Sequence, residues 1–147
     1  MKATEIVSLV TAIVGAMLGT AGFVISVLAF LRDRPRLKVC LQWDMAEIGN
    51  PTNKIGVVRV ANIGRRAVYI SAVALELPKG SEHTHLVLND SLRGNRLEEG
   101  GAEATFPVKY DGLSKYKAKW NRIRAMAEDT AGKKYYSAYP DKKPSWA

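Results

Sequence analysis

The chain has 147 residues and one cysteine, and 22 Lys and Arg residues against 14 Asp and Glu residues give it a formal net charge of +8. One cysteine excludes an internal disulfide, and with it the disulfide-stapled scaffold of many small secreted proteins. The positive charge favours anionic partners, either lipid head groups or nucleic acid, unless it only keeps the protein soluble.

The first predicted element is an apolar run from Ile6 to Leu31 that contains no charged residue. It exceeds the roughly 20 residues with which a helix crosses the hydrocarbon core of a bilayer. It also exceeds the apolar part of a signal peptide, about 7–15 residues, and no Ala-x-Ala cleavage site follows it. We therefore predict a short N-terminal tail at residues 1–5 and an uncleaved transmembrane helix at residues 6–31.

Basic residues follow the predicted helix closely, whereas only Lys2 precedes it. Lys and Arg near the ends of a membrane helix favour the cytoplasmic side. We therefore predict a single-pass protein of the cell (inner) membrane with a cytoplasmic C-terminal domain and a basic junction at residues 32–36. The residues predicted to bind anionic lipid head groups are Arg32, Arg34, Arg36 and Lys38.

A stripe of small residues along the apolar run includes Gly15 and Gly19, which are spaced as in a G-x-x-x-G motif. Small residues let two membrane helices approach closely. These glycines are therefore the predicted surface for a homo-oligomer or for another protein partner. The alternative is a glycine-rich helix that stays monomeric, because glycine is common in membrane helices.

Pro35 ends the helix, and beyond it apolar and polar residues alternate, which predicts strands. The breaker-rich segment 44–54 is predicted to be a loop. In the third strand, two sets of apolar residues share a face only if a bulge lies near Ser71. Pro107 indicates an edge strand, and helical spacing predicts a short extra helix at residues 113–120. The predicted strands are residues 37–43, 55–62, 67–77, 85–88, 104–108, 122–128 and 133–137.

About seven short strands separated by turns are typical of an antiparallel β-sandwich, so the predicted fold is mainly β. The segment Val58–Gly64 resembles the V-x-V-x-N-x-G segment of many immunoglobulin-like or fibronectin-like bacterial domains, and Asp129–Tyr135 resembles their last hairpin. The resemblance implies an immunoglobulin-like β-sandwich at residues 37–139, without the cysteine pair of true immunoglobulin domains. The proline- and lysine-rich residues 140–147 are predicted to be a flexible tail.

The whole layout, an N-terminal helix, a basic junction and a C-terminal sandwich, resembles small bacterial single-pass membrane proteins that mostly lack an assigned function. This resemblance spans the chain but depends on short, permissive motifs. It therefore implies an architecture and no activity.

The best candidate for a metal site is the pair His83 and His85, because residues two apart on a strand project to the same face. Glu82 or Asp90 could add an oxygen ligand to a zinc ion. These are the only two histidines of the chain, and a two-histidine site without a firm third ligand is weak. We predict no metal site.

Residues suited to catalysis are also sparse. Cys40 has no evident base to activate it, and Glu98 and Glu99 are adjacent on an extended chain, where side chains point to opposite faces. The chain contains neither of the two glycine-rich phosphate-binding motifs, G-x-x-x-x-G-K-[ST] and G-x-G-x-x-G. We therefore predict no catalytic residue, no cofactor and no enzyme activity.

One stretch, residues 115–124, interleaves basic and aromatic residues, a pattern that suits phosphate binding with base stacking or insertion at a bilayer interface. The alternative, which we favour, is amphipathic packing with the aromatic side chains on the core and the basic ones in water. The candidate polyanion or partner surface consists of Lys115, Lys117, Lys119, Trp120, Arg122 and Arg124.

The predicted function is a membrane-tethered, non-catalytic binding or scaffold module whose basic domain is held at the lipid surface. The alternative is a sensor or effector whose domain binds a nucleotide or nucleic acid and acts through the membrane helix. We favour lipids as partners over nucleic acid, because nonspecific basic charge is common.

Overall fold

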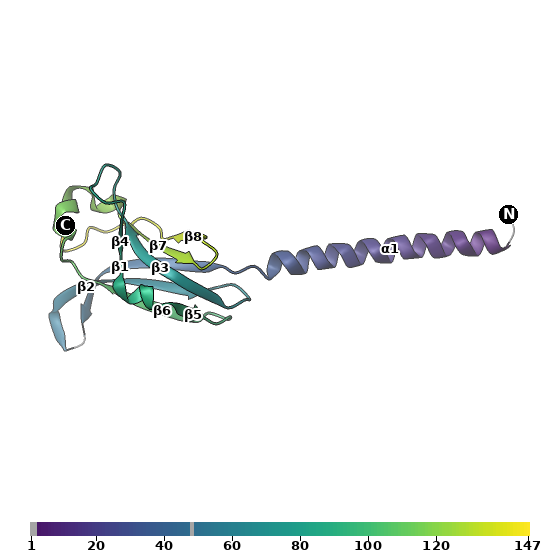
Figure 1. Cartoon of the computed structure of the whole chain (residues 1–147), viewed down its shortest axis with the longest axis horizontal. Helices are drawn as coiled ribbons and strands as arrows, with labels where there is room; N and C mark the ends of the chain where they lie inside the picture. The colour runs from purple at the N-terminus through teal and green to yellow at the C-terminus, as the bar shows by residue number, and fades with distance from the viewer. Residues whose placement is uncertain (1–2, 48) are drawn as a thin grey trace. The chain divides into compact units, whose positions relative to one another are not determined.

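The computed structural model describes residues 3–47 and 49–147 (Figure 1). The chain divides into two compact units, with the boundary between Arg34 and Pro35. The first unit contains one helix, and the second contains all the described strands.

The helix α1 runs from Ala3 to Arg32 and includes the predicted span at residues 6–31. None of its described residues is buried, so large apolar side chains are exposed along its whole length. The hydroxyl groups of Thr11, Thr20 and Ser26 donate to the carbonyl oxygen four residues earlier, at 2.9, 2.8 and 2.9 Å. These polar groups therefore need no water, and α1 is long and apolar enough to span a membrane.

The first two strands form one long antiparallel hairpin, β1 (Leu37–Glu47) and β2 (Asn50–Asn62). The prediction of a loop at residues 44–54 is therefore wrong for most of that segment. The ladder accommodates its turn-forming residues through register shifts, one of them at Asp44, whose φ is +58°. Such a bulge lets strand pairing continue beyond the irregular residue. Ile48 lies outside the described residues.

The described strands belong to two antiparallel sheets. The first has the strand order β1-β2-β6, and the second has the order β4-β3-β7-β8, with β5 also paired to β3. The structure thus confirms an N-terminal apolar helix followed by an antiparallel β-sheet domain. The other strands are β3 (Val68–Glu76), β4 (His85–Val87), β5 (Asn95–Leu97), β6 (Glu103–Val108), β7 (Arg124–Asp129) and β8 (Lys134–Tyr136).

The predicted bulge in β3 is confirmed. The register of β3 against β7 shifts between Ile70 and Ala72. Because of this shift, Val68 and Ile70 before the bulge and Val73 and Leu75 after it are all buried. A regular strand would have turned one of these two sets away from the core.

Two short elements were missed by the sequence analysis, and one was placed almost correctly. Asn89–Arg93 forms the 3₁₀ helix η1, and β5 follows it, in a segment for which we predicted neither a helix nor a strand. Elements of three to five residues are too short to show a period. The predicted helix at residues 113–120 is the 3₁₀ segment η2 (Leu113–Arg122), which is kinked at Lys119. Pro107 does lie on an edge strand, β6.

Both sheets contribute side chains to one hydrophobic core cluster, and η2 adds Leu113. The fully buried residues of the cluster come from β2, β3, β6, β7 and the two ends of η2. The largest of them are Ile70, Leu75, Leu113, Ile123, Val58, Val60, Val73 and Val108.

The C-terminal segment differs from the flexible tail that we expected at residues 140–147. Trp146 is only 9 % exposed and belongs to the core cluster. Its ring lies 5.5 Å from that of Trp43 and 6.2 Å from that of Tyr110. The local composition suggested fraying, whereas the packing of Trp146 on Trp43 and Tyr110 holds the segment against β1.

Candidate functional site

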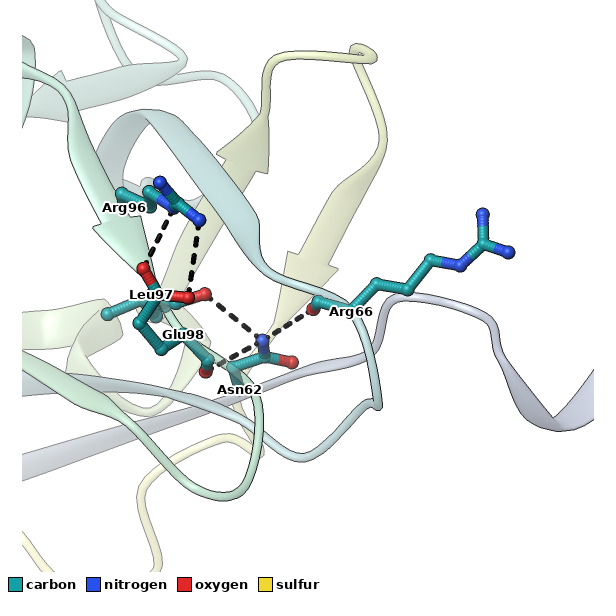
Figure 2. Close-up of polar contacts among 5 residues, drawn as sticks. All are labelled: Asn62, Arg66, Arg96, Leu97 and Glu98. Atoms are coloured by element: carbon teal, nitrogen blue, oxygen red, sulfur yellow. Dashed lines mark hydrogen bonds and ion pairs between the residues drawn. The ribbon is translucent and has the colours of Figure 1, made fainter.

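The end of the domain at which the chain enters from the junction is organised by one buried side chain, Asn62. Its amide nitrogen donates to the carbonyl oxygens of Arg66, Leu97 and Glu98 at 2.7, 3.2 and 3.0 Å (Figure 2). Its amide oxygen accepts from the backbone N–H of Gly64 at 3.0 Å. One fully buried residue thus connects the turn after β2 to the chain that follows β5.

Backbone hydrogen bonds hold the same turn to the entry point of the chain. The N–H of Ile63 donates to the carbonyl oxygen of Arg36 at 2.9 Å, and Gly101 and Ala102 exchange hydrogen bonds with Asn62 at 3.0 and 2.9 Å. The backbone of Asn62 has no positive φ, and Asp44 is the only described residue other than glycine that has one. Asn62 acts instead through its side chain, as in an Asx turn.

The side chains at this end are mostly basic. Arg65 and Arg66 are exposed, and Figure 2 shows the Arg66 side chain extending away from Asn62. Arg96 pairs with Glu98 at 2.9 Å. The turn therefore presents cationic groups on a backbone fixed by hydrogen bonds.

The four junction cations predicted to contact lipid are all exposed: Arg32, Arg34, Arg36 and Lys38. Within the first unit, the Arg34 guanidinium lies 5.7 Å from the centre of the Phe30 ring. A cation over an aromatic ring at this distance is weakly attracted to it. The arrangement suits the interface of a bilayer, where aromatic rings and cationic groups both gather.

The glycines predicted for self-association lie on an open face of α1. A Cβ atom added at Gly15 or Gly19 would meet no atom within 4 Å outside the helix itself and the adjacent residues. The backbone there is accessible to another helix, as close packing between small residues requires.

The residues of the candidate polyanion surface divide into two groups. Lys115, Lys117, Lys119 and Arg122 are exposed on η2, and Lys115 lies 3.9 Å from Glu82. The aromatic side chains of η2 pack against the core cluster instead. This geometry matches the amphipathic packing that we favoured, and it places the partly buried Trp120 against the core.

Arg124, the first residue of β7, lies in a different environment. It donates to the Glu76 carboxylate and lies over the rings of Tyr136 and Tyr139, 4.0 and 5.2 Å from their centres. The hydrogen bond from Arg124 lowers the pKa of Glu76, and the same bond raises the pKa of Arg124. Both groups therefore stay charged at neutral pH.

A surface hollow of about 590 Å³ adjoins this ion pair. Its lining includes Lys79, Arg122, Arg124 and Tyr139. The three cations exceed the single carboxylate of Glu76 in the lining, so the hollow attracts anions. Sequence reasoning identified Arg122 and Arg124, but it missed Lys79 and Tyr139 because they are distant in the chain.

The residues considered for metal binding do not assemble into a site. His83 precedes β4 and lies 4.0 Å from Glu82, while His85 contacts Thr84 at 3.0 Å. Within residues 3–47 and 49–147, no group of three or more His, Cys, Asp or Glu side chains could hold a metal ion.

The other residues considered for chemistry are also dispersed. Cys40 lies partly buried in β1, opposite Arg59. Glu98 is paired with Arg96, and Glu99 is exposed beside it.

A polar cluster at the far end of β1 also escaped the sequence analysis. The Asp44 carboxylate accepts hydrogen bonds from the backbone N–H of Ser145 at 2.9 Å, from the Ser145 hydroxyl, and from the Tyr110 hydroxyl at 3.2 Å. Although partial burial opposes the change, the bonds from Ser145 and Tyr110 lower the pKa of Asp44. Burial raises the pKa of Tyr110 to about 12.

No family model matches this chain, and no curated protein matches it.

Proposed function

We propose that the protein is a membrane-anchored, non-catalytic binding or scaffold module whose basic domain lies against anionic lipid head groups. In this proposal α1 is a single transmembrane helix. The two sheets form an immunoglobulin-like β-sandwich, and the junction cations Arg32, Arg34, Arg36 and Lys38 contact the lipid phosphates.

One observation carries the proposal, namely the exposure of the apolar side chains of α1. A helix on the surface of a soluble protein has one apolar and one polar face, whereas residues 6–31 of α1 carry no charged side chain on any side. The side-chain hydroxyl groups of Thr11, Thr20 and Ser26 bond to the backbone of α1 itself. A surface of this kind is stable in lipid and is costly in water.

The short junction supports contact between the domain and the membrane surface. Only four residues separate the end of α1 at Arg32 from the start of β1 at Leu37. Each Lys or Arg close to an anionic bilayer contributes about 1 kcal/mol, and the effect falls off within a Debye length. The length of the chain keeps Arg34 within about 7 Å and Arg36 within about 14 Å of the end of α1, so these cations can reach the head groups.

We place the domain in the cytoplasm because the basic residues follow α1. A reporter that is active only outside the cytoplasm, fused after Ala147, tests this orientation. The proposal predicts an inactive reporter there and an active one when it is fused before the helix. The opposite pattern would overturn the orientation and the lipid contact together.

We also propose that α1 associates with a partner helix, or with a second copy of itself, through Gly15 and Gly19. The open backbone at both glycines supports close packing. A symmetric dimer, the commonest form of homo-oligomer, would place two domains side by side at the membrane.

A second candidate function is supported by the basic hollow beside Arg124, which could bind a nucleotide or nucleic acid. The test is titration of the full chain in neutral lipid nanodiscs with a labelled oligonucleotide over a range of salt concentrations. Tight binding that is lost on Arg122→Ala with Lys79→Ala would favour this candidate. Weak binding that is unchanged by the pair would leave lipid as the favoured partner.

A further inference from the structure

The turn after β2, residues 62–66, carries an exposed apolar side chain between two buried residues. Ile63 is 59 % exposed, whereas Asn62 is fully buried and Gly64 is buried. The backbone and side-chain bonds of Asn62 fix the path of the chain on both sides of Ile63. These hydrogen bonds therefore hold the turn in a conformation that leaves the Ile63 side chain exposed.

Exposed arginines lie in the same turn as Ile63 and in the segment bonded to it. Arg65 and Arg66 follow it in the same turn, and Arg36, whose carbonyl oxygen accepts from the Ile63 N–H, is also exposed. Acidic residues also occur close by in the chain: Asp33 lies three residues before Arg36, and Glu98, which is paired with Arg96, and Glu99 follow β5. An apolar side chain with arginines nearby suits the interface of an anionic bilayer, where the apolar group enters the acyl boundary and the cations meet phosphates.

The covalent chain keeps this turn close to the end of α1. Arg36 is the fourth residue after Arg32, and four extended residues span at most about 14 Å. Ile63 is hydrogen-bonded to Arg36, so it cannot lie far from the helix end in any orientation of the domain. If α1 spans a bilayer, the turn is within reach of the head groups.

We infer that the turn at residues 62–66 is a second membrane contact, with Ile63 inserted at the interface of an anionic bilayer and Arg36, Arg65 and Arg66 bound to head-group phosphates. This inference rests on the proposed function, because it requires α1 to be inserted. One anchoring helix lets the domain pivot about the junction. A second contact fixes which face of the domain points to the cytoplasm.

The test uses the full chain in nanodiscs of phosphatidylcholine with phosphatidylglycerol and a head-group quencher. A polarity-sensitive fluorophore is attached to a single cysteine placed at Ile63, in a Cys40→Ala background. The matched control position is Met45, which is also exposed but lies near the opposite end of β1. We expect a blue shift and quenching at position 63 and neither at position 45.

A charge-reversal pair identifies the cause of the contact. Arg65→Glu with Arg66→Glu should abolish the blue shift and the quenching at position 63. Lys117→Glu with Lys119→Glu makes the same change of charge on η2. This segment lies just before the start of β7, which pairs with the end of β3, away from the turn. The second pair should leave both signals unchanged. Equal loss from the two pairs would contradict the inference, because it would mean that general charge and not this turn makes the contact.

A third label, at Leu31 near the end of α1, separates this inference from the proposed function. Quenching at Leu31 together with a water-exposed label at Ile63 would overturn the second contact and leave the membrane anchor intact. A water-exposed label at Leu31 would overturn the anchor itself.

Discussion

The helix and the sheet domain are stabilised in different ways. In α1, the hydroxyl groups of Thr11, Thr20 and Ser26 bond to the backbone one turn away, and none of the described residues of α1 is buried. The domain depends on partners that are distant in the sequence, such as Ser145 with Asp44. A change in the domain should therefore unfold the domain, whereas a change in α1 should alter only what α1 contacts.

The largest effect is expected from Trp146→Ala, because Trp146 lies in the core cluster and contacts two other aromatic rings. Removal of a buried tryptophan costs about 3–5 kcal/mol of folding free energy. Urea unfolding of the full chain in micelles, followed by the circular dichroism of the strands, measures it. Trp146→Phe should cost less, because it keeps a ring and removes a buried Nε1–H that lacks a partner. Equal losses would mean that ring packing is not what holds the segment.

A smaller loss, about 2–3 kcal/mol, is expected from Asn62→Ala. The substitution leaves the Gly64 N–H and three carbonyl oxygens without the bonds that Asn62 gives them. The same unfolding experiment measures it, and the exposed Asn121→Ala serves as the control. If the two variants are equally stable, the amide does not organise the turn.

Ser145→Ala should cost about 1 kcal/mol, the usual worth of one hydrogen bond, and should raise the pKa of Asp44. The pKa of Asp44 is lowered in the folded chain. Its carboxylate therefore stabilises the folded state at pH values above the ordinary pKa of 3.8, and this contribution is lost as the pH falls through the lowered pKa. An NMR titration of the Asp44 carboxyl carbon reports the shift directly. Ser114→Ala, on the exposed part of η2, should leave that titration unchanged; an equal shift would contradict the assignment to Ser145.

Gly15→Leu with Gly19→Leu should leave the stability of the domain unchanged and reduce association of α1. Leucine at these positions prevents the close approach that the small residues allow. Chemical cross-linking in native membranes measures the association. Val10→Leu with Val14→Leu introduces the same two leucine side chains on the opposite side of the helix, at about 100° per residue. Association that survives the glycine substitutions, or that falls equally in both pairs, would exclude the glycine face as the contact.

The same difference between the helix and the domain explains what the sequence could predict. A long apolar run and alternating strands are local patterns, so α1 and most strands could be found from the sequence. The bulge near Ser71 could also be found, because the two apolar sets of β3 required it. The short β5 and the long hairpin could not, because pairing with a neighbouring strand overrode the local breakers.

For the candidate sites as well, local patterns could be predicted from the sequence and contacts between distant residues could not. The exposed basic residues of the junction and of η2 were visible as a charge pattern. The packing of Trp146, the hydrogen bonds of Asp44 and the hollow beside Arg124 depend on residues brought together by the fold. Residues that are dozens of positions apart leave no signal in a single sequence.

The central claim is that α1 holds the full chain in a lipid bilayer. Extraction of native membranes with alkaline carbonate, followed by intact mass measurement of the protein, tests it most directly. We predict that the chain stays in the membrane pellet with α1 still attached. Release of the full chain into the supernatant, or a mature protein that lacks the helix, would contradict the account.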